Sequence, residues 1–252
     1  MSFMENQPYL SVIIPTRNEE KTIGKTLLSV DGYLAKQSYS YEIIVLDNNS
    51  ADKTAAVVEG YQKTMLSLRL EKKNGKGKGE AVKNAMAIAQ GQYRLFMDAD
   101  NATTIDHVEK MLPFFEQGYE VIIGTRDSRD NKLAKQAVPQ PLYKRLFGDL
   151  GNILIQVLVL WGIWDTQCGF KAFSAKAAET IFPKVTMYKW SFDIEVLGMA
   201  KKLGYRIGII PVYWINNPDS RVSMGAYIGV LLDVFKIKWN LITDKYGIRK
   251  GK

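Results

Sequence analysis

Two carboxylates, Asp98 and Asp100, are separated by one residue directly after the largely apolar run Tyr93–Met97. Hard oxygen ligands in this pattern suit Mg²⁺ or Mn²⁺, because such ions bind through one or two carboxylates together with substrate phosphates. Without a cation, the two charges would repel each other and raise a carboxyl pKa. The same pair also suits a turn and a helix cap before the segment that starts at Thr104, so the sequence leaves both interpretations open.

A glycine-rich run, Asn74–Glu80, places three glycines and two lysines before a predicted helix. Such a turn can present backbone N–H groups, lysine charge and a helix N-terminus to an anion. It matches neither G-x-x-x-x-G-K-[ST] nor G-x-G-x-x-G, since Glu80 follows Gly79. An exposed turn with solvated lysines explains the same residues, and neither interpretation is preferred.

The elements that must position these residues alternate between strand and helix. Strands are predicted at Leu10–Pro15, Tyr41–Asp47, Leu68–Glu71, Tyr93–Met97 and Tyr119–Gly124. Helices are predicted at Lys21–Ala35, from a cap at Ser50 or Asp52 to Gln62, at Gly79–Gln90 and at Thr104–Gln117. This alternation predicts an α/β fold with a mostly parallel sheet flanked by helices. Ligands then lie beyond the carboxyl ends of the strands.

The second half of the chain has a different character. Asp127–Gln140 is polar and reads as a loop, and Pro141 is predicted to open a helix that continues to Val159. A helix at Phe192–Leu203, a strand at Arg206–Val212 and a helix at Gly225–Ile242 follow. We expect one domain, 1–252, whose two halves of different character meet at about residues 126 and 127.

The composition narrows the class of protein. The 252 residues are 46% hydrophobic and 24% charged, which is ordinary for a globular chain. One cysteine and one histidine exclude a disulfide framework and a Cys/His zinc site. A net charge of +8 predicts an anionic partner, but dispersed lysines without a recognition motif argue against nucleic acid. With no secretory signal and no apolar run long enough to span a bilayer, we expect a cytoplasmic location.

Seven segments together resemble the family-2 glycosyltransferases, whose members have the nucleotide-sugar-binding GT-A fold. They are VIIPTRNEE (12–20), VLDNNSADKT (45–54), NGKGKGEAVKNAM (74–86), FMDADNATT (96–104), IIGTR (122–126), DTQCGFKAF (165–173) and KWSFDIEVL (189–197). The chain is most similar to the dolichyl-phosphate β-glucosyltransferases, with the dolichyl-phosphate mannose synthases next. Asn48 and Ala102 depart from the mannose-synthase pattern, which puts a metal shell of that type in doubt.

The resemblance implies a role for each matching residue. On the donor side it implies a nucleoside pocket lined by Pro15, Arg17, Glu19 and Asp47, with Lys78 near the nucleotide, Asp98 facing ribose and metal, and Asp100 binding the metal. It implies a sugar pocket shaped by Gln167, Gly169 and Phe170, with Asp193 at the reacting centre. On the acceptor side, Arg126 meets the acceptor phosphate or the leaving group, and Arg221 and Ser223 join a phosphate-binding loop. The resemblance implies a nucleotide-sugar half at about 1–126 and an acceptor half at about 127–252, and the implied cofactor is Mg²⁺ or Mn²⁺.

The implied reaction joins two anions, because the donor releases a nucleoside diphosphate and the acceptor is a lipid phosphate. A phosphate monoester is already largely anionic at neutral pH, so a strong general base is unnecessary and Asp193 can orient a sugar hydroxyl instead. Cationic groups must hold the anions together, and Arg126, Arg145 and Arg221 are candidates. Direct attack on an α-linked donor inverts the anomeric carbon and gives a β-linked product.

We therefore expect glucose transfer from UDP-glucose to polyprenyl or dolichyl phosphate by a protein attached peripherally to the cytoplasmic face of a membrane. Alternatives are a mannose-synthase-like enzyme that uses GDP-mannose, a transferase with a soluble acceptor and a non-catalytic nucleotide-sugar-binding subunit. The amphipathic helices Ile153–Trp164 and Tyr227–Trp239, the latter with Lys236 and Lys238, either lie in the membrane interface or pack on the core. A membrane-anchored partner or a homo-oligomer is compatible with both.

Overall fold

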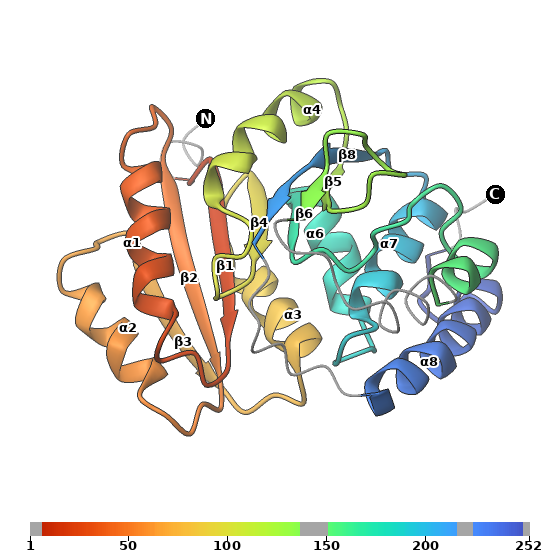
Figure 1. The fold of residues 1–252 in the computed structure, drawn as a ribbon, viewed down its shortest axis with the longest axis horizontal. Coiled ribbons are helices and arrows are strands. Elements are labelled where there is room, and N and C mark those ends of the chain that lie inside the picture. Colours follow the sequence, from red (N-terminus) through yellow and green to blue (C-terminus); the bar gives the residue numbers. More distant parts are fainter. Residues whose placement is uncertain (1–6, 137–150, 216–223, 249–252) are drawn as a thin grey trace.

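The computed structural model describes residues 7–136, 151–215 and 224–248. Its centre is a seven-stranded sheet with the order β3-β2-β1-β4-β7-β5-β8 (Figure 1). The predicted sites Arg145, Arg221 and Ser223 lie outside the described residues, as does the predicted start of a helix at Pro141; residues 151–158 of that helix are helical.

The predicted strands are confirmed with small changes at their ends. They are β1 (Leu10–Thr16), β2 (Tyr41–Asn48), β3 (Leu68–Lys73), β4 (Tyr93–Met97), β5 (Val121–Thr125) and β8 (Ile207–Pro211). Strands β3, β2, β1 and β4 run parallel to one another, and β5 runs parallel to β8. The β-branched and apolar side chains of β1, β4 and β5 are buried on both faces apart from the partly buried Tyr93, as expected for a parallel sheet covered by helices.

One strand of the seven-stranded sheet was not predicted. Strand β7 (Phe170–Ser174) lies between β4 and β5 and is antiparallel to both. Its sequence, FKAFS, carries a lysine in an otherwise apolar run, which hides the strand from a search for buried segments. Helix α6 (Ala175–Ile181), capped by the Ser174 hydroxyl, follows it at once and was also not predicted.

Helices cover both faces of the sheet (Figure 1). One face packs against α1 (Ile23–Leu34) and the 3₁₀ turn Ile105–Lys110, and the other packs against α3 (Lys78–Ile88), α6, α7 (Phe192–Leu203) and α8 (Met224–Ile242). Helix α2 (Thr54–Gln62) lies beside α1 and β3, and the short 3₁₀ turn Phe182–Lys184 follows α6. The two apolar cores therefore fix the sheet, and the sheet fixes the loops at its carboxyl edge.

The helix predicted at Thr104–Gln117 is wrong as a single element. The structure has the 3₁₀ turn Ile105–Lys110 followed by a short α4 (Leu112–Glu116). Pro113 explains the break, because a proline inside a continuous helix would remove a hydrogen bond and clash with the preceding turn, whereas it is tolerated in the first turn.

A second, two-stranded sheet joins the polar segment after β5 to the chain after β8. It consists of the parallel strands β6 (Lys135–Gln136) and β9 (Tyr213–Trp214).

Candidate active site

The loops after β1 and β2 are joined by hydrogen bonds. The Ser50 hydroxyl donates to the Asp47 carboxylate and accepts from the Asn18 backbone N–H at 2.9 Å. The Asn18 side-chain oxygen accepts from Ala51 N–H at 2.8 Å. Asn18 and Asn49 have φ values of 56° and 59°, a left-handed conformation that asparagine tolerates better than most residues. Asp47 is thus buried and fixed at the carboxyl edge.

Asp98 lies at the centre of the candidate site. Its carboxylate accepts a hydrogen bond and ion pair from Lys78 Nζ, at the first residue of α3. On its other side lies Gly169, where an added Cβ would stand 1.9 Å from Asp98 Oδ2. Burial alone would lower the pKa of Lys78, but the charges of Asp98, Asp193 and Asp100 outweigh burial and raise it. Lys78 is therefore a cation held among carboxylates.

Asp100 follows on the same turn. Its Oδ1 accepts from Ala102 N–H at 3.0 Å, and the Thr26 hydroxyl anchors the turn by donating to Ala99 O at 2.6 Å. Burial raises the pKa of Asp100, and the neighbouring charges of Asp98 and then Glu19 raise it further. Asp100 is therefore also a turn residue, and its carboxylate stands where added positive charge would be favourable.

The residues present fit a divalent cation whose coordination shell is completed by the substrate. No group of three or more His, Cys, Asp or Glu side chains that could hold a metal occurs in the described part of the chain. Two carboxylates alone suit Mg²⁺ or Mn²⁺, which also take water and phosphate oxygens. Because Gly169 has no side chain, the Asp98 carboxylate can occupy the position that a Cβ would fill.

The glycine-rich turn does not offer an open cradle of N–H groups. The N–H of Gly75 donates to Asn48 Oδ1 at 2.6 Å, and that of Gly79 donates to Tyr188 O at 2.9 Å. An added Cβ on Gly77 would stand 2.4 Å from Tyr188 O, so glycine is needed for close packing there. The turn is therefore not an open anion-binding loop. It is not simply an exposed turn with solvated lysines either, since Lys78 contacts Asp98.

Asn48 accounts for one departure from the mannose-synthase pattern. Its amide accepts from Gly75 N–H and also donates to Gly77 O at 3.2 Å. A carboxylate at this position could accept the first hydrogen bond but could not donate the second. The amide therefore ties β2 to the turn that carries Lys78.

Asp193 is paired with a lysine that sequence reasoning missed. Lys171 Nζ donates to Asp193 Oδ1 at 2.7 Å and to Cys168 O at 2.5 Å, and its side chain is completely buried. Burial raises the pKa of Asp193, although Lys171 and Lys78 act in the opposite direction. Lys171 and Lys78 both approach the Phe96 ring, at 5.5 and 6.0 Å. A lysine inside the apolar run FKAFS was the signal that could have identified this pair.

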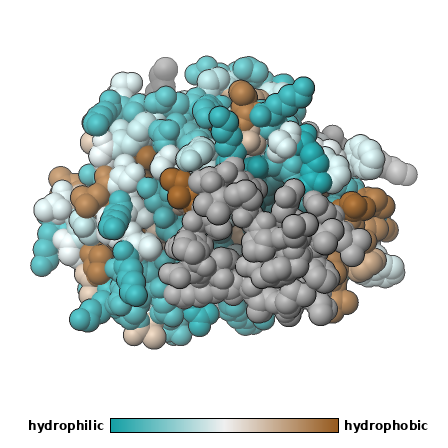
Figure 2. Space-filling view, viewed as in Figure 1, coloured by the Kyte–Doolittle hydropathy of each residue, from teal (hydrophilic) through white to brown (hydrophobic). Residues whose placement is uncertain are grey.

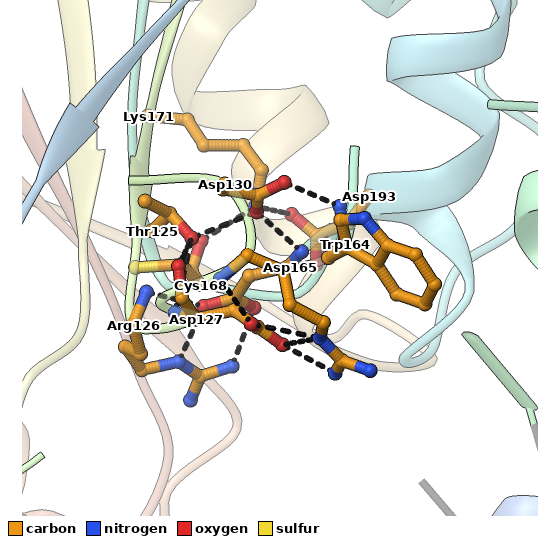
Figure 3. A network of polar contacts seen from close by, with 10 residues as sticks. Thr125, Arg126, Asp127, Asp130, Trp164, Asp165, Cys168, Lys171 and Asp193 are labelled. Carbon is orange, nitrogen blue, oxygen red and sulfur yellow. Dashed lines mark hydrogen bonds and ion pairs between the residues drawn. The ribbon is translucent and has the colours of Figure 1, made fainter. Parts of the chain in front are cut away.

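Arg126 is held in a second charged network, drawn in Figure 3. Its Nε and Nη2 donate to the two oxygens of Asp165, each at 2.8 Å, and its backbone N–H donates to Asp165 Oδ2 at 2.8 Å. The guanidinium also lies 5.0 Å from the centre of the Trp214 ring. Burial would raise the pKa of Asp165, but the charge of Arg126 outweighs it and the pKa is lowered.

Asp130 fixes the other side of this network. It accepts from Trp164 N–H at 2.7 Å, from Asp165 N–H at 2.8 Å and from the Thr125 hydroxyl at 2.8 Å (Figure 3). The end of β5 and the turn that carries Asp165 are thereby locked together. Neither Asp130 nor Asp165 was given a role from sequence, because both carboxylates lie in polar segments without periodicity.

Glu195, like Asp193, is buried at the start of α7. It accepts from the backbone N–H groups of Thr186 and Met187, both at 2.9 Å, and from the Tyr246 hydroxyl at 2.9 Å. These bonds fix the segment 186–189, which packs on Gly77 and Gly79. Glu195 therefore has a structural role.

The other predicted residues are brought together only in part. The pKa of Asp100 responds to Glu19, which places Glu19 near the acidic pair, while Pro15 is buried at the end of β1. Arg17 and Gln167 are exposed. Burial raises the pKa of Cys168 to about 12, as expected for an inert packing residue.

A Gly169→Ala substitution tests the close approach to Asp98. The new methyl group would push the carboxylate away from its present position and from Lys78, so we expect Mn²⁺ affinity to fall by about tenfold or more. Calorimetric titration with Mn²⁺ and UDP measures this. Gly60→Ala is the matched control, because nothing lies within 4 Å of the added Cβ. Unchanged Mn²⁺ affinity in Gly169→Ala would show that Asp98 is not a ligand.

Comparisons with known proteins show the family and the fold. The model of the family described as glycosyl transferase family 2 matches residues 11–182. A dolichyl-phosphate β-glucosyltransferase of Dictyostelium discoideum is 32% identical over 256 residues, which cover 96% of this chain and 77% of that protein.

Two solved structures share the fold. Mannosyl-3-phosphoglycerate synthase from Rubrobacter xylanophilus has a TM-score of 0.69 at 15% identity, with 97% of this chain and 77% of that chain covered. Glucosyl-3-phosphoglycerate synthase from Mycobacterium tuberculosis, in complex with Mn²⁺, UDP-glucose and phosphoglyceric acid, has a TM-score of 0.66 at 16% identity, with 97% and 81% covered. At these identities the likeness concerns the fold.

Proposed function

The chain belongs to glycosyl transferase family 2, and we propose that it transfers glucose from UDP-glucose to the phosphate of a polyprenyl lipid of the dolichyl type, at the cytoplasmic face of a membrane. The observation that carries the proposal is the charge arrangement at the carboxyl edge of the sheet. There Asp98, Asp100 and Lys78 adjoin Asp193, and Arg126 lies close enough for its pKa to respond to Asp98. The names of relatives such as the Dictyostelium protein support the choice of sugar and acceptor.

On the donor side, Asp98 and Asp100 would hold Mg²⁺ or Mn²⁺, and Lys78 lies beside them. When bound, the cation supplies positive charge to the departing diphosphate. Lys78 adds a further positive charge at the same edge, and the fixed loop of Asp47 bounds the space for the nucleoside. The carbon–oxygen bond to the diphosphate breaks as the acceptor oxygen attacks from the opposite side, so an α-linked donor gives a β-linked product.

On the acceptor side, Arg126 is the described residue best suited to meet a phosphate. Asp165 occupies its Nε and Nη2, which fixes the guanidinium and leaves Nη1 outside this fork. The acceptor phosphate is already anionic near neutral pH, so it needs no proton acceptor. Asp193 is bound to Lys171 and is therefore suited to orienting a sugar hydroxyl rather than to removing a proton.

Among the helices that the structure describes, none has the length and apolar character of a membrane span. We propose that the lipid acceptor is taken from the membrane surface by a peripheral contact or with the help of a membrane-anchored partner.

The experiment is transfer of radiolabelled sugar from a panel of nucleotide sugars to polyprenyl phosphate in detergent. We expect a labelled lipid from UDP-glucose, and loss of labelling when the divalent cation is removed with EDTA. Labelling from GDP-mannose alone would overturn the choice of donor. Turnover only on a soluble acceptor would overturn the lipid acceptor, and nucleotide-sugar binding without turnover on any acceptor would indicate a non-catalytic subunit.

A further inference from the structure

Two neighbouring helices expose a continuous apolar face that the proposed chemistry does not use. We define the docking face as Ile153, Val157 and Trp161, from residues 151–158 and the turn after them, together with Leu232, Phe235, Trp239 and Ile242 of α8. Each of these side chains is at least half exposed, up to 76% for Trp161. In Figure 2, apolar side chains gather at the edge of the molecule where these helices lie.

The spacing of the residues makes this a surface rather than scattered side chains. Ile153 and Val157 are four residues apart on the helix and Trp161 follows in the turn, while the four residues of α8 follow one another at intervals of three or four. Such intervals place side chains on one side of a helix. Val234 and Ile237, on the opposite side of α8, are completely buried. Helix α8 therefore packs with one side on the core and presents a second apolar side outward.

The two helices are held side by side. A Cβ added at Gly151 would lie 3.8 Å from the Leu231 side chain. At Gly198 of α7 an added Cβ would lie 2.9 Å from Val159 and 3.1 Å from Leu241, which brings residues from both helices onto α7. The docking face is thus a supported part of the fold with a fixed shape.

The edge of the docking face is cationic. A groove of about 220 Å³ between the helices is lined by Lys201, Lys202 and Lys238 as well as apolar side chains. Lys201 donates to Trp161 O at 2.9 Å, while Lys202 pairs with Asp244 at 3.3 Å. Lys201 and Lys238 have no carboxylate partner within the part of the chain that is described. Their charge is therefore available to an anion.

The acidic side chain of α8 is turned away from this face. The single acidic residue of α8 is Asp233, whose Oδ2 accepts from the Ser191 hydroxyl at 2.6 Å. Ser191 is two residues before Asp193, so α8 connects the docking face directly to the start of α7 at the candidate active site. A ligand on this face would lie on a helix that borders the proposed reacting centre.

We propose that the docking face inserts its apolar side chains into the surface of an anionic bilayer while Lys201 and Lys238 bind phospholipid headgroups in the groove. Tryptophans beside lysines suit this boundary, where an apolar body and a polar tip are both satisfied. A second copy of the chain fits less well, because a symmetric pair would place like charges against each other. The proposal deepens the proposed function and rests on it for the reason why a bilayer must be approached.

The test is flotation of the full chain with phosphatidylcholine vesicles, with and without phosphatidylglycerol. We expect binding to the anionic vesicles that weakens as salt is added. Phe235→Ser/Trp239→Ser is expected to weaken binding by about tenfold or more. Lys201→Gln/Lys238→Gln is expected to weaken binding to anionic vesicles by roughly fivefold for each lysine and to leave binding to neutral vesicles unchanged.

Matched controls distinguish the effect of the docking face from the effect of removing an exposed apolar side chain or exposed lysines elsewhere. Leu66→Ser removes an apolar side chain that is 98% exposed outside the docking face, and Lys36→Gln/Lys63→Gln removes two exposed lysines elsewhere. Both should bind as the wild type does. Equal binding to the two kinds of vesicle, or wild-type binding by both face variants, would overturn the proposal. So would a stable dimer in light scattering that Phe235→Ser/Trp239→Ser dissociates.

The outcome is separable from that of the proposed function, because flotation needs neither donor nor acceptor. Wild-type protein that floats with anionic vesicles but transfers no glucose in detergent would refute the proposed function and leave the docking face standing. Transfer in detergent without flotation would do the reverse.

Discussion

Asp100→Asn is expected to reduce glucose transfer by about a hundredfold or more, while the protein stays folded. The substitution keeps the shape and the hydrogen bond from Ala102 N–H but removes the negative charge that a divalent cation requires. Loss of one electrostatic contact at a developing charge commonly costs this much. Initial rates at saturating UDP-glucose, with a parallel titration of Mn²⁺, measure the effect.

The stability of Asp100→Asn distinguishes this role from a structural one. The pKa of Asp100 is raised in the folded protein, so its charge opposes folding above that pKa, and this penalty is relieved as the pH falls. Removing the charge should therefore leave the melting temperature at neutral pH equal or higher. Asp106→Asn, on the exposed side of the 3₁₀ turn, is the control and should change neither rate nor stability. A lower melting temperature together with a normal rate would show that Asp100 only shapes the turn.

Lys171→Met is expected to cost about 3–5 kcal/mol of folding free energy, the largest effect on stability that we predict. Methionine fills a similar volume, but Asp193 would remain buried without its cation. Urea unfolding followed by circular dichroism measures the loss. Lys176→Met, at an exposed position of α6, is the matched control and should be nearly neutral.

The double variant Lys171→Met/Asp193→Leu tests the cause. When both charges are removed, no uncompensated charge remains, and much of the lost stability should return. If the double variant folds but does not transfer glucose, Asp193 serves the reaction as well as the fold. A single Lys171→Met variant with wild-type stability would contradict the buried ion pair.

The sequence predicted those parts of the fold that depend on local patterns. Tyr93–Met97 and Phe192–Leu203 were predicted at the residues where the structure has β4 and α7. In both segments the spacing of apolar residues along the chain indicates the type of secondary structure. Strand β7 was not predictable in this way, because it pairs with strands distant in the sequence and its buried lysine is paired with Asp193, 22 residues away.

In the candidate site, too, features that depend on neighbouring residues could be found from the sequence, whereas contacts between distant residues could not. The acidic pair was chosen as a candidate from its position after a strand, and the structure places Asp98 against Lys78. The partners that fix the charged side chains were not recognised: Asp165 for Arg126 and Lys171 for Asp193. Each comes from another element, so its contact exists only once the sheet has formed. The glycines at 77 and 79 suggested anion binding, whereas their neighbours show that close packing on residues 187–189 requires them.

The most direct test of the account is a crystal of the protein grown with UDP-glucose and Mn²⁺, with the metal located by its anomalous scattering. We predict one manganese peak in contact with the Asp100 carboxylate and the donor diphosphate, with Asp98 on the same side. A diphosphate bound at this edge without manganese, or a manganese ion bound away from both carboxylates, would contradict it.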